Sequence, residues 1–116
     1  MSKKHKEKKE LIDSVPKSGG TAVWESDVIP TGKTFRLKVF GCYDPPVGDG
    51  TGSIVHLEYG EGATWETIRV IGYGTHNHEV NQEYVGDGVK KFRITRTNNS
   101  SKDKIIYTWF EGFQVD

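Results

Sequence analysis

The chain of 116 residues is predicted to be all-β: an antiparallel β-sandwich, jelly-roll-like, of about seven to eight strands. Three observations predict this fold. Runs of β-forming residues recur at intervals of roughly ten residues, as in sandwiches and barrels. Gly-rich turns separate the runs, including two copies of Val-Gly-Asp-Gly at 47–50 and 85–88, and Asp-Gly suits tight turns because it tolerates positive φ. The region after residue 20 contains no convincing helix.

Alternation of apolar and polar residues supports the individual strands. It is clearest in 34–41, with Phe35, Leu37 and Val39 on one face, and in 53–59. Residues 64–73 are apolar on both faces, which predicts a central strand or a change of face at a bulge. Residues 104–113 are the most aromatic run and are predicted to be central in a sheet. The other predicted strands are 22–25, 79–85 and 89–97, whereas 42–52 and 72–78 are predicted to be loops.

The N-terminal segment differs in composition from the rest, so the chain is divided into a flexible tail at 1–20 and a sandwich domain at 21–116. Residues 1–10 carry five lysines and two glutamates, a composition that buries too little apolar area to offset the entropy of ordering. The tail is either solvated or a docking peptide that orders on a partner. Leu11, Ile12 and Val15 are the apolar anchors that docking would use.

Charge and composition argue against several classes of protein. Lysine plus arginine equal aspartate plus glutamate, at 16 each, and the positive excess lies in the tail, so the domain is a poor general binder of nucleic acid. Basic residues near 36–38 and 90–96 are expected to form a solvated sheet face. No apolar run is long enough for a membrane span, and the N-terminus lacks the apolar core of a signal peptide, so cytoplasmic synthesis is expected. The single cysteine, Cys42, is expected to be a small buried hydrophobe.

Two groups of residues could bind a ligand. His76 and His78 would point to the same side of an extended segment and could both reach one metal ion, although the sequence places no third ligand. Exposed loop histidines are the simpler interpretation. Tyr43 and Tyr73, with Asp44 nearby, are candidates for stacking on a sugar or a protein surface, whereas most other aromatic residues are expected in the core.

The chain resembles small all-β accessory modules of bacteriophage particles. The resemblance is one of style over residues 20–116: the segment at 24–33, Trp-Glu-Ser-Asp-Val-Ile-Pro-Thr-Gly-Lys, precedes Gly-punctuated strands that end in Tyr-Thr-Trp-Phe-Glu-Gly-Phe at 107–113. It implies a jelly-roll decoration or attachment protein on a capsid or tail, associated with the virion and forming a symmetric homo-oligomer. No functional residue is transferred by it.

These observations predict a non-enzymatic structural or binding module attached to a larger assembly such as a viral shell or tail, without a cofactor. The first alternative is a carbohydrate-binding module that uses Tyr43 and Tyr73 on surface glycans. The second is a metal-dependent enzyme that uses His76 and His78. No Gly-x-Ser-x-Gly elbow or phosphate-binding loop supports other catalysis.

Overall fold

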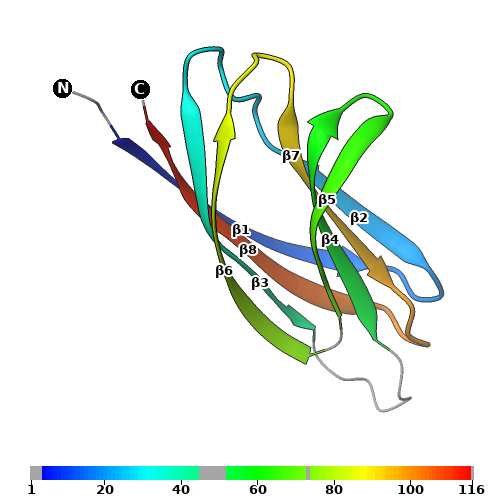
Figure 1. Cartoon of the computed structure of the whole chain (residues 1–116). Coiled ribbons are helices and arrows are strands. Elements are labelled where there is room, and N and C mark those ends of the chain that lie inside the picture. Colours follow the sequence, from blue (N-terminus) through cyan, green and yellow to red (C-terminus); the bar gives the residue numbers. More distant parts are fainter. Residues whose placement is uncertain (1–3, 45–51, 73, 116) are drawn as a thin grey trace.

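The computed structural model describes residues 4–44, 52–72 and 74–115, which form two antiparallel four-stranded sheets packed face to face (Figure 1). Within these ranges the chain forms no helix, and therefore none that could cross a membrane. One sheet has the order β1 (Lys4–Val15), β8 (Lys104–Val115), β3 (Thr34–Asp44) and β6 (Gly74–Val85). The other has the order β2 (Gly20–Glu25), β7 (Lys91–Asn98), β4 (Ser53–Glu61) and β5 (Thr64–Ile71).

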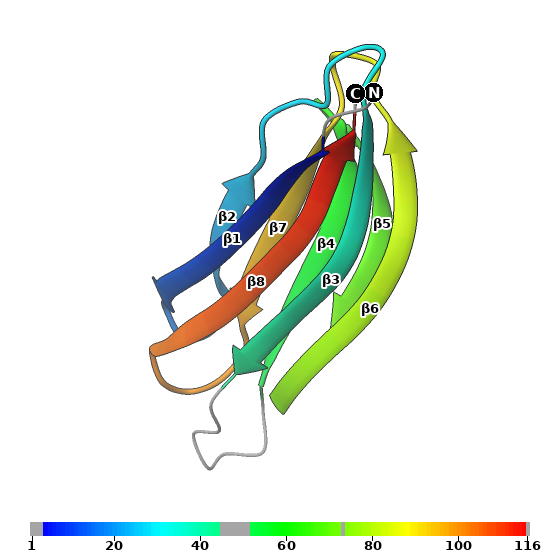
Figure 2. The same ribbon diagram turned by 90° about the vertical axis from the view of Figure 1, so that its left-hand side faces the viewer.

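The pairing of the strands follows the jelly-roll pattern. The first strand pairs with the last, the second with the seventh, the third with the sixth and the fourth with the fifth. A long antiparallel ribbon gives these pairs when it is wrapped into two sheets. In Figure 2 the strands β1, β8, β3 and β6 run side by side in front of the second sheet. The predicted jelly-roll-like sandwich is confirmed.

The core lies between the sheets and is centred on aromatic rings. Phe110 of β8 stacks on Phe35 of β3, with ring centroids 5.5 Å apart and planes 11° from parallel. Phe92 of β7 lies 5.1 Å from Phe110, and Trp24 of β2 lies 5.7 Å from it. Burying one such Phe side chain contributes about 1.5–3 kcal/mol. Phe110 therefore joins both sheets and fixes which face of β8 points inward.

Two β-bulges change which residues of β3 and β5 point to the core, so simple alternation of apolar and polar residues does not describe these strands. The register of β3 against both its neighbours shifts between Leu37 and Val39. The shift turns Val39 to the outer face and places Phe40 and Cys42, both fully buried, in the core. The expectation that Val39 shares a face with Leu37 is thus wrong, because a bulge adds one residue and reverses the alternation. A similar register shift between β4 and β5 accounts for the two apolar faces of β5, so the predicted change of face at a bulge is confirmed, whereas β5 is an edge strand and not a central one.

Residues 4–15 differ from the predicted flexible tail, because they form β1 and pair with β8 along its whole length. Leu11 and Val15 are 7% and 0% exposed and belong to the core, whereas Ile12 is 64% exposed. Asp13 pairs with Arg96 of β7, a fully buried guanidinium. Composition alone predicts that the entropy cost of ordering this segment is not met. Pairing with β8 and the inward position of Leu11, Asp13 and Val15 offset that cost.

Residues 74–78 also differ from expectation, because the predicted loop at 72–78 is largely strand. The start of β6 pairs with the second half of β3, from Phe40 to Asp44. Backbone hydrogen bonding to a neighbouring strand outweighs the polar composition of this segment. Residue 73 lies outside the described residues.

Asn98 closes the corner where the β1–β2 and β7–β8 turns meet. Its fully buried side chain donates to the carbonyl oxygens of Val15 and Lys102, each at 2.9 Å, and accepts the Ser100 amide at 3.0 Å. Its own carbonyl accepts the Gly19 amide at 2.8 Å. The Asn98 side chain thus satisfies three backbone groups, one at the end of β1 and two in the β7–β8 turn.

The second Val-Gly-Asp-Gly copy forms the β6–β7 connection. The Asp87 carboxylate accepts hydrogen bonds from the amides of Val89 at 2.9 Å and Lys90 at 2.8 Å, an Asx turn. These amide donors, Lys90 first, hold the pKa of the Asp87 carboxyl below its usual value. The first copy, at 47–50, lies outside the described residues.

We expect Leu11→Ala to lower the free energy of unfolding by about 2–3 kcal/mol, since it leaves a cavity in the core. Ile12→Ala, one residue away on the outer face, should change it by less than about 1 kcal/mol. Urea denaturation of both variants measures the difference. Equal and negligible effects would show that residues 4–15 do not pack in the sandwich.

Asn98→Ala should cost about 2–4 kcal/mol, because the removed amide leaves buried backbone groups at this corner without partners. Asn99→Ala, in the same turn but exposed, serves as the matched control and should stay within about 0.5 kcal/mol of the parent. Thermal unfolding followed by circular dichroism compares them, and a parent-like Asn98→Ala variant would contradict the structural role of the corner.

Candidate binding face

The outer face of the β1–β8–β3–β6 sheet, which faces the viewer in Figure 2, carries the largest group of exposed aromatic residues. Inward packing of Phe110 sends the alternate residues of β8 outward. We define the aromatic patch as five residues: the outward Ile105, Tyr107 and Trp109 of β8, together with Ile12 and Tyr43, the cross-strand neighbours of Tyr107. The exposed fractions are 64% for Ile12, 44% for Ile105, 42% for Tyr43 and 37% for Tyr107.

Strand register arranges this face in rows that cross all four strands. One row runs Ile12, Tyr107, Tyr43 and Thr75. The next runs Glu10, Trp109, Gly41 and Asn77. Residues opposite each other on neighbouring strands have Cβ atoms about 4.5–5.5 Å apart, so the members of a row touch. The patch is therefore continuous across β1, β8 and β3.

Trp109 is held across β3 by two features of its row. Its indole nitrogen donates to the side-chain oxygen of Asn77 on β6 at 2.7 Å. The ring passes over Gly41, where a Cβ atom would overlap the indole and the carbonyl oxygen of His76. Only glycine leaves room for the ring at this position. The result is a half-buried indole whose orientation is fixed before any partner arrives.

Tyr43 and Tyr107 form the second aromatic element of the patch. Their ring centroids are 5.8 Å apart and their planes are inclined by 31°. Together with Trp109, Ile12 and their neighbours they line a shallow depression of about 290 Å³. The depression is almost wholly apolar, and it extends across β1, β8 and β3.

Charged residues occupy the two edge strands beyond the patch. The row Lys8, Glu111, Val39 and Glu79 comes next, followed by the row Lys6, Phe113, Arg36 and Glu83. Lysines therefore take the β1 positions of both rows and glutamates take the β6 positions. Arg36 and Glu83 are also neighbours within the chain, with 3.8 Å between the guanidinium nitrogen and the carboxylate oxygen.

Of the residues predicted for ligand stacking, the structure places Tyr43 in the aromatic patch. The backbone of Asp44 ends β3 beside it, but the side chain of Asp44 lies outside the described part of the chain, as does all of Tyr73. Sugar stacking by these residues stays a prediction.

The predicted histidine pair lies on the inner side of β6. His76 and His78 are half-buried and stand opposite Cys42 and Phe40, with their ring centroids 6.0 Å apart and nearly perpendicular. Among the described residues, no group of three His, Cys, Asp or Glu side chains is placed to hold a metal ion. Metal binding by this pair stays a prediction.

The three predicted docking anchors of the N-terminal segment separate into two classes. Leu11 and Val15 pack in the core and are not exposed to a partner, whereas Ile12 belongs to the aromatic patch. Alternation along β1 accounts for the difference, because residues one apart point to opposite faces.

Three residues of the patch were not predicted: Ile105, Tyr107 and Trp109. The parity that they share on 104–113 is visible in the sequence, but both parities of this run are apolar, and most aromatic residues other than Tyr43 and Tyr73 are expected in the core. The inner parity instead holds Ile106, Thr108 and Phe110, together with Gly112. A central strand that carries aromatic residues on both faces must expose one of these faces, and this sequence pattern could have identified the three residues.

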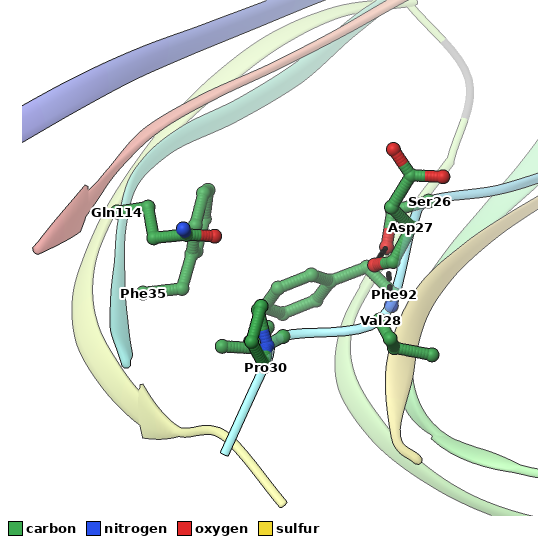
Figure 3. A pocket seen from close by; sticks show the side chains of 8 residues that line it. Ser26, Asp27, Val28, Pro30, Phe35, Phe92 and Gln114 are labelled. Carbon is green, nitrogen blue, oxygen red and sulfur yellow. Dashed lines mark hydrogen bonds between the residues drawn. The ribbon is translucent and has the colours of Figure 1, made fainter. Parts of the chain in front are cut away.

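A smaller pocket of about 190 Å³ lies at one end of the sandwich, between the β2–β3 connection and the core (Figure 3). Phe35 and Phe92 line it with Pro30 and Gln114. The Ser26 hydroxyl accepts the Phe92 amide at 2.9 Å and donates to the Asp27 carbonyl at 2.8 Å. Both rings are almost completely buried, so the pocket presents little surface to a ligand.

Two tyrosines with buried hydroxyl groups, Tyr59 and Tyr84, lie next to the core. Tyr84 of β6 packs against Tyr59 and Phe92, with centroids 4.7 Å and 5.0 Å away. Burial, with a smaller contribution from the Glu66 carboxylate, raises the pKa of Tyr84 to about 12. The phenol is therefore neutral at physiological pH and acts as a packing group.

Comparisons with known proteins show similarity of architecture only. No family model and no curated protein matches the chain. The crystal structure of PirA is 12% identical, with a TM-score of 0.42 over 87% of this chain and 92% of that one. Chains from structures of infectious bursal disease virus, strains Gx and Gt, are 9% and 10% identical, with TM-scores of 0.48 and 0.46. The alignments span 99% and 98% of this chain but about a third, 32%, of each viral chain. Similarity at this level carries no functional conclusion.

Proposed function

We propose that the protein is a non-enzymatic structural module of a larger protein assembly, which it joins through the aromatic patch. The single observation that carries the proposal is the exposure of this patch: two isoleucines and two tyrosines, each 37% to 64% exposed, around a half-buried tryptophan. Contiguous exposed apolar surface of this kind marks interaction sites in soluble proteins. Tyrosine and tryptophan are enriched at such interfaces.

The kind of assembly that we propose is a virus particle, and within it a phage capsid decoration or tail accessory protein. The resemblance of the segments at 24–33 and 107–113 to phage modules supports this choice. The jelly roll is also an architecture that viral shells use repeatedly. The five side chains of the aromatic patch are aromatic or aliphatic, which suits docking better than catalysis.

Tyr107→Glu should remove the chain from its assembly without unfolding it, because a carboxylate at the centre of an apolar contact loses its hydration. Virus particles from the source organism are purified on a density gradient and probed for the parent chain and the variant. We expect the parent to band with the particles and Tyr107→Glu to remain at the top of the gradient.

The matched control is Val70→Glu, which changes a valine that is 55% exposed on the other sheet and should still band with the particles. Circular dichroism confirms that each variant is folded. Particles without the parent chain, or equal retention of Tyr107→Glu, would contradict the proposal.

Carbohydrate binding is the second candidate, and the geometry of Trp109 favours it. The Trp109 indole lies over Gly41 and is fixed by a hydrogen bond to Asn77, and such a preoriented aromatic ring suits stacking on a sugar. Sugars also need several polar partners, and the lining of the depression is almost wholly apolar. A glycan array separates the two functions: an assembly module should retain no glycan, whereas retention that is lost in Tyr43→Ala would favour the lectin-like function.

A further inference from the structure

We infer that the place of β1, along the edge of β8 and over the buried Arg96, also accepts β1 of a second copy, so that two chains form a dimer by exchanging this strand. We call this place the β1 slot. The inference is independent of the aromatic patch, because it rests on the inner face of β1. Three features carry it: the position of β1, the chemistry of its slot and the turn that joins it to β2.

The position of β1 lets it leave the sandwich without disturbing the other strands. β1 lies at the edge of its sheet and pairs with β8 along its whole length (Figure 2). The next strand, β2, belongs to the opposite sheet, and residues 16–19 connect the two. Removal of β1 therefore keeps every other strand pair and leaves the edge of β8 open. An open strand edge pairs readily with another strand.

The inner face of the β1 slot requires a particular sequence of side chains. Leu11 and Val15 are 7% and 0% exposed and fill positions in the core. Between them, Asp13 provides a carboxylate to Arg96 of β7, whose side chain is 1% exposed. A buried guanidinium that loses its carboxylate is strongly destabilising. An incoming strand must therefore carry an acid two residues away from each of two apolar residues, and β1 of a second copy carries these three side chains in the same order.

The turn between β1 and β2 is strained in the closed form. Ser18 has a φ of 60° and Gly19 a φ of 90°. Positive φ is unfavourable for a residue with a Cβ atom, such as Ser18. The turn also brings the Pro16 carbonyl so close to Gly20 that a Cβ atom there would overlap it. An extended hinge releases this strain, and short strained hinges favour strand exchange.

Hydrogen bonds at the same turn favour the closed form. The amides of Ser18 and Gly19 donate to the carbonyl oxygens of Ser100 and Asn98, at 3.0 Å and 2.8 Å respectively. The exchanged dimer forms the contacts of β1 with β8 and Arg96 again, twice because the dimer is symmetric. The two forms thus differ mainly at the turn and in the entropy of association. We expect a monomer in dilute solution and an exchanged dimer at high protein concentration.

Two substitutions of Ser18 test the turn. Ser18→Val should raise the association constant of the dimer by about tenfold or more, because a β-branched residue suits an extended hinge and not positive φ. Ser18→Gly should lower it by a similar factor, since glycine adopts the closed turn without strain. Sedimentation velocity of the full chain, from micromolar to millimolar concentration, compares them. Ser101→Val and Ser101→Gly, in the exposed β7–β8 turn, are the matched controls and should associate like the parent.

An engineered disulfide reports which chain fills the slot. Ser14 and Ile105 are exposed and stand opposite each other on β1 and β8. Directly opposed residues of antiparallel strands lie within the Cα separation that a disulfide spans. In Ser14→Cys/Ile105→Cys, the bond should form within one chain in the monomer and between two chains in the exchanged dimer. The dimer fraction from gel filtration, oxidised and run on a denaturing gel without reductant, should migrate as a covalent dimer.

Reversal of the Asp13–Arg96 pair in separate chains tests the chemistry of the slot. Asp13→Lys places a cation against the guanidinium, and Arg96→Glu places a carboxylate against Asp13, so each variant alone should fold poorly. In an exchanged dimer between the two variants, both pairs again join opposite charges. An equal mixture refolded together should therefore give a folded heterodimer, whereas each variant refolded alone should not give a dimer.

Three results would overturn the inference: a parent and a Ser18→Val variant that both stay monomeric up to millimolar concentration, a dimer fraction that migrates as single chains, or a mixture that yields no heterodimer. Tyr107→Glu separates this inference from the proposed function. Tyr107 lies on the outer face of β8, so Tyr107→Glu should still exchange β1 while it fails to band with the particles. Loss of banding without exchange in the parent would leave the assembly function and remove the dimer, and exchange with parent-like banding of Tyr107→Glu would do the reverse.

Discussion

The alternation of β8 about Phe110 is the constraint on which the other features depend. Phe110 contacts rings from three strands, including the parallel stack on Phe35, so it cannot leave the interior without breaking both sheets. A strand has a period of two, and once Phe110 points inward, Tyr107 and Trp109 must point outward. The exposed aromatic patch is therefore a consequence of core packing on the same strand, and a register slip that buried the patch would expose the core.

The edge strand β1 completes both the interior and the binding face. Leu11 and Val15 close one side of the core, while Ile12 extends the patch to the edge of the sheet. The pair formed by Asp13 and the buried Arg96 adds a specific tether between β1 and the opposite sheet. Removing one member of such a pair leaves an uncompensated buried charge, which is costly. The pair therefore ties the order of β1 to the register of the whole sandwich.

Much of the fold could be predicted from the sequence, whereas most of the binding face could not. Alternation in 34–41 and 53–59 and the Gly-rich turns identified the strands and the sandwich. Composition alone predicts a flexible tail at 4–15 and a loop at 74–78, but both segments form strands. Pairing with β8 and β3, respectively, supplies the order that a polar segment lacks by itself. The sequence identifies Tyr43 and Ile12 as candidates, but it does not single out Tyr107 or Trp109, because both faces of 104–113 are apolar. Hydrophobicity alone does not tell which of two apolar faces points inward; the small inner neighbours Thr108 and Gly112 decide it through packing.

The chemistry of the binding face favours an extended protein partner over a small ligand. Its depression is shallow and apolar, whereas small-molecule sites are concave and carry a few placed polar groups. The hydrogen bond from Trp109 to Asn77 is already made inside the chain and fixes the ring rather than offering a free donor. A rigid aromatic centre loses little side-chain entropy on binding. Charged rows beyond such a centre add specificity and orientation more than affinity. A flat protein surface with apolar residues at its middle meets these conditions.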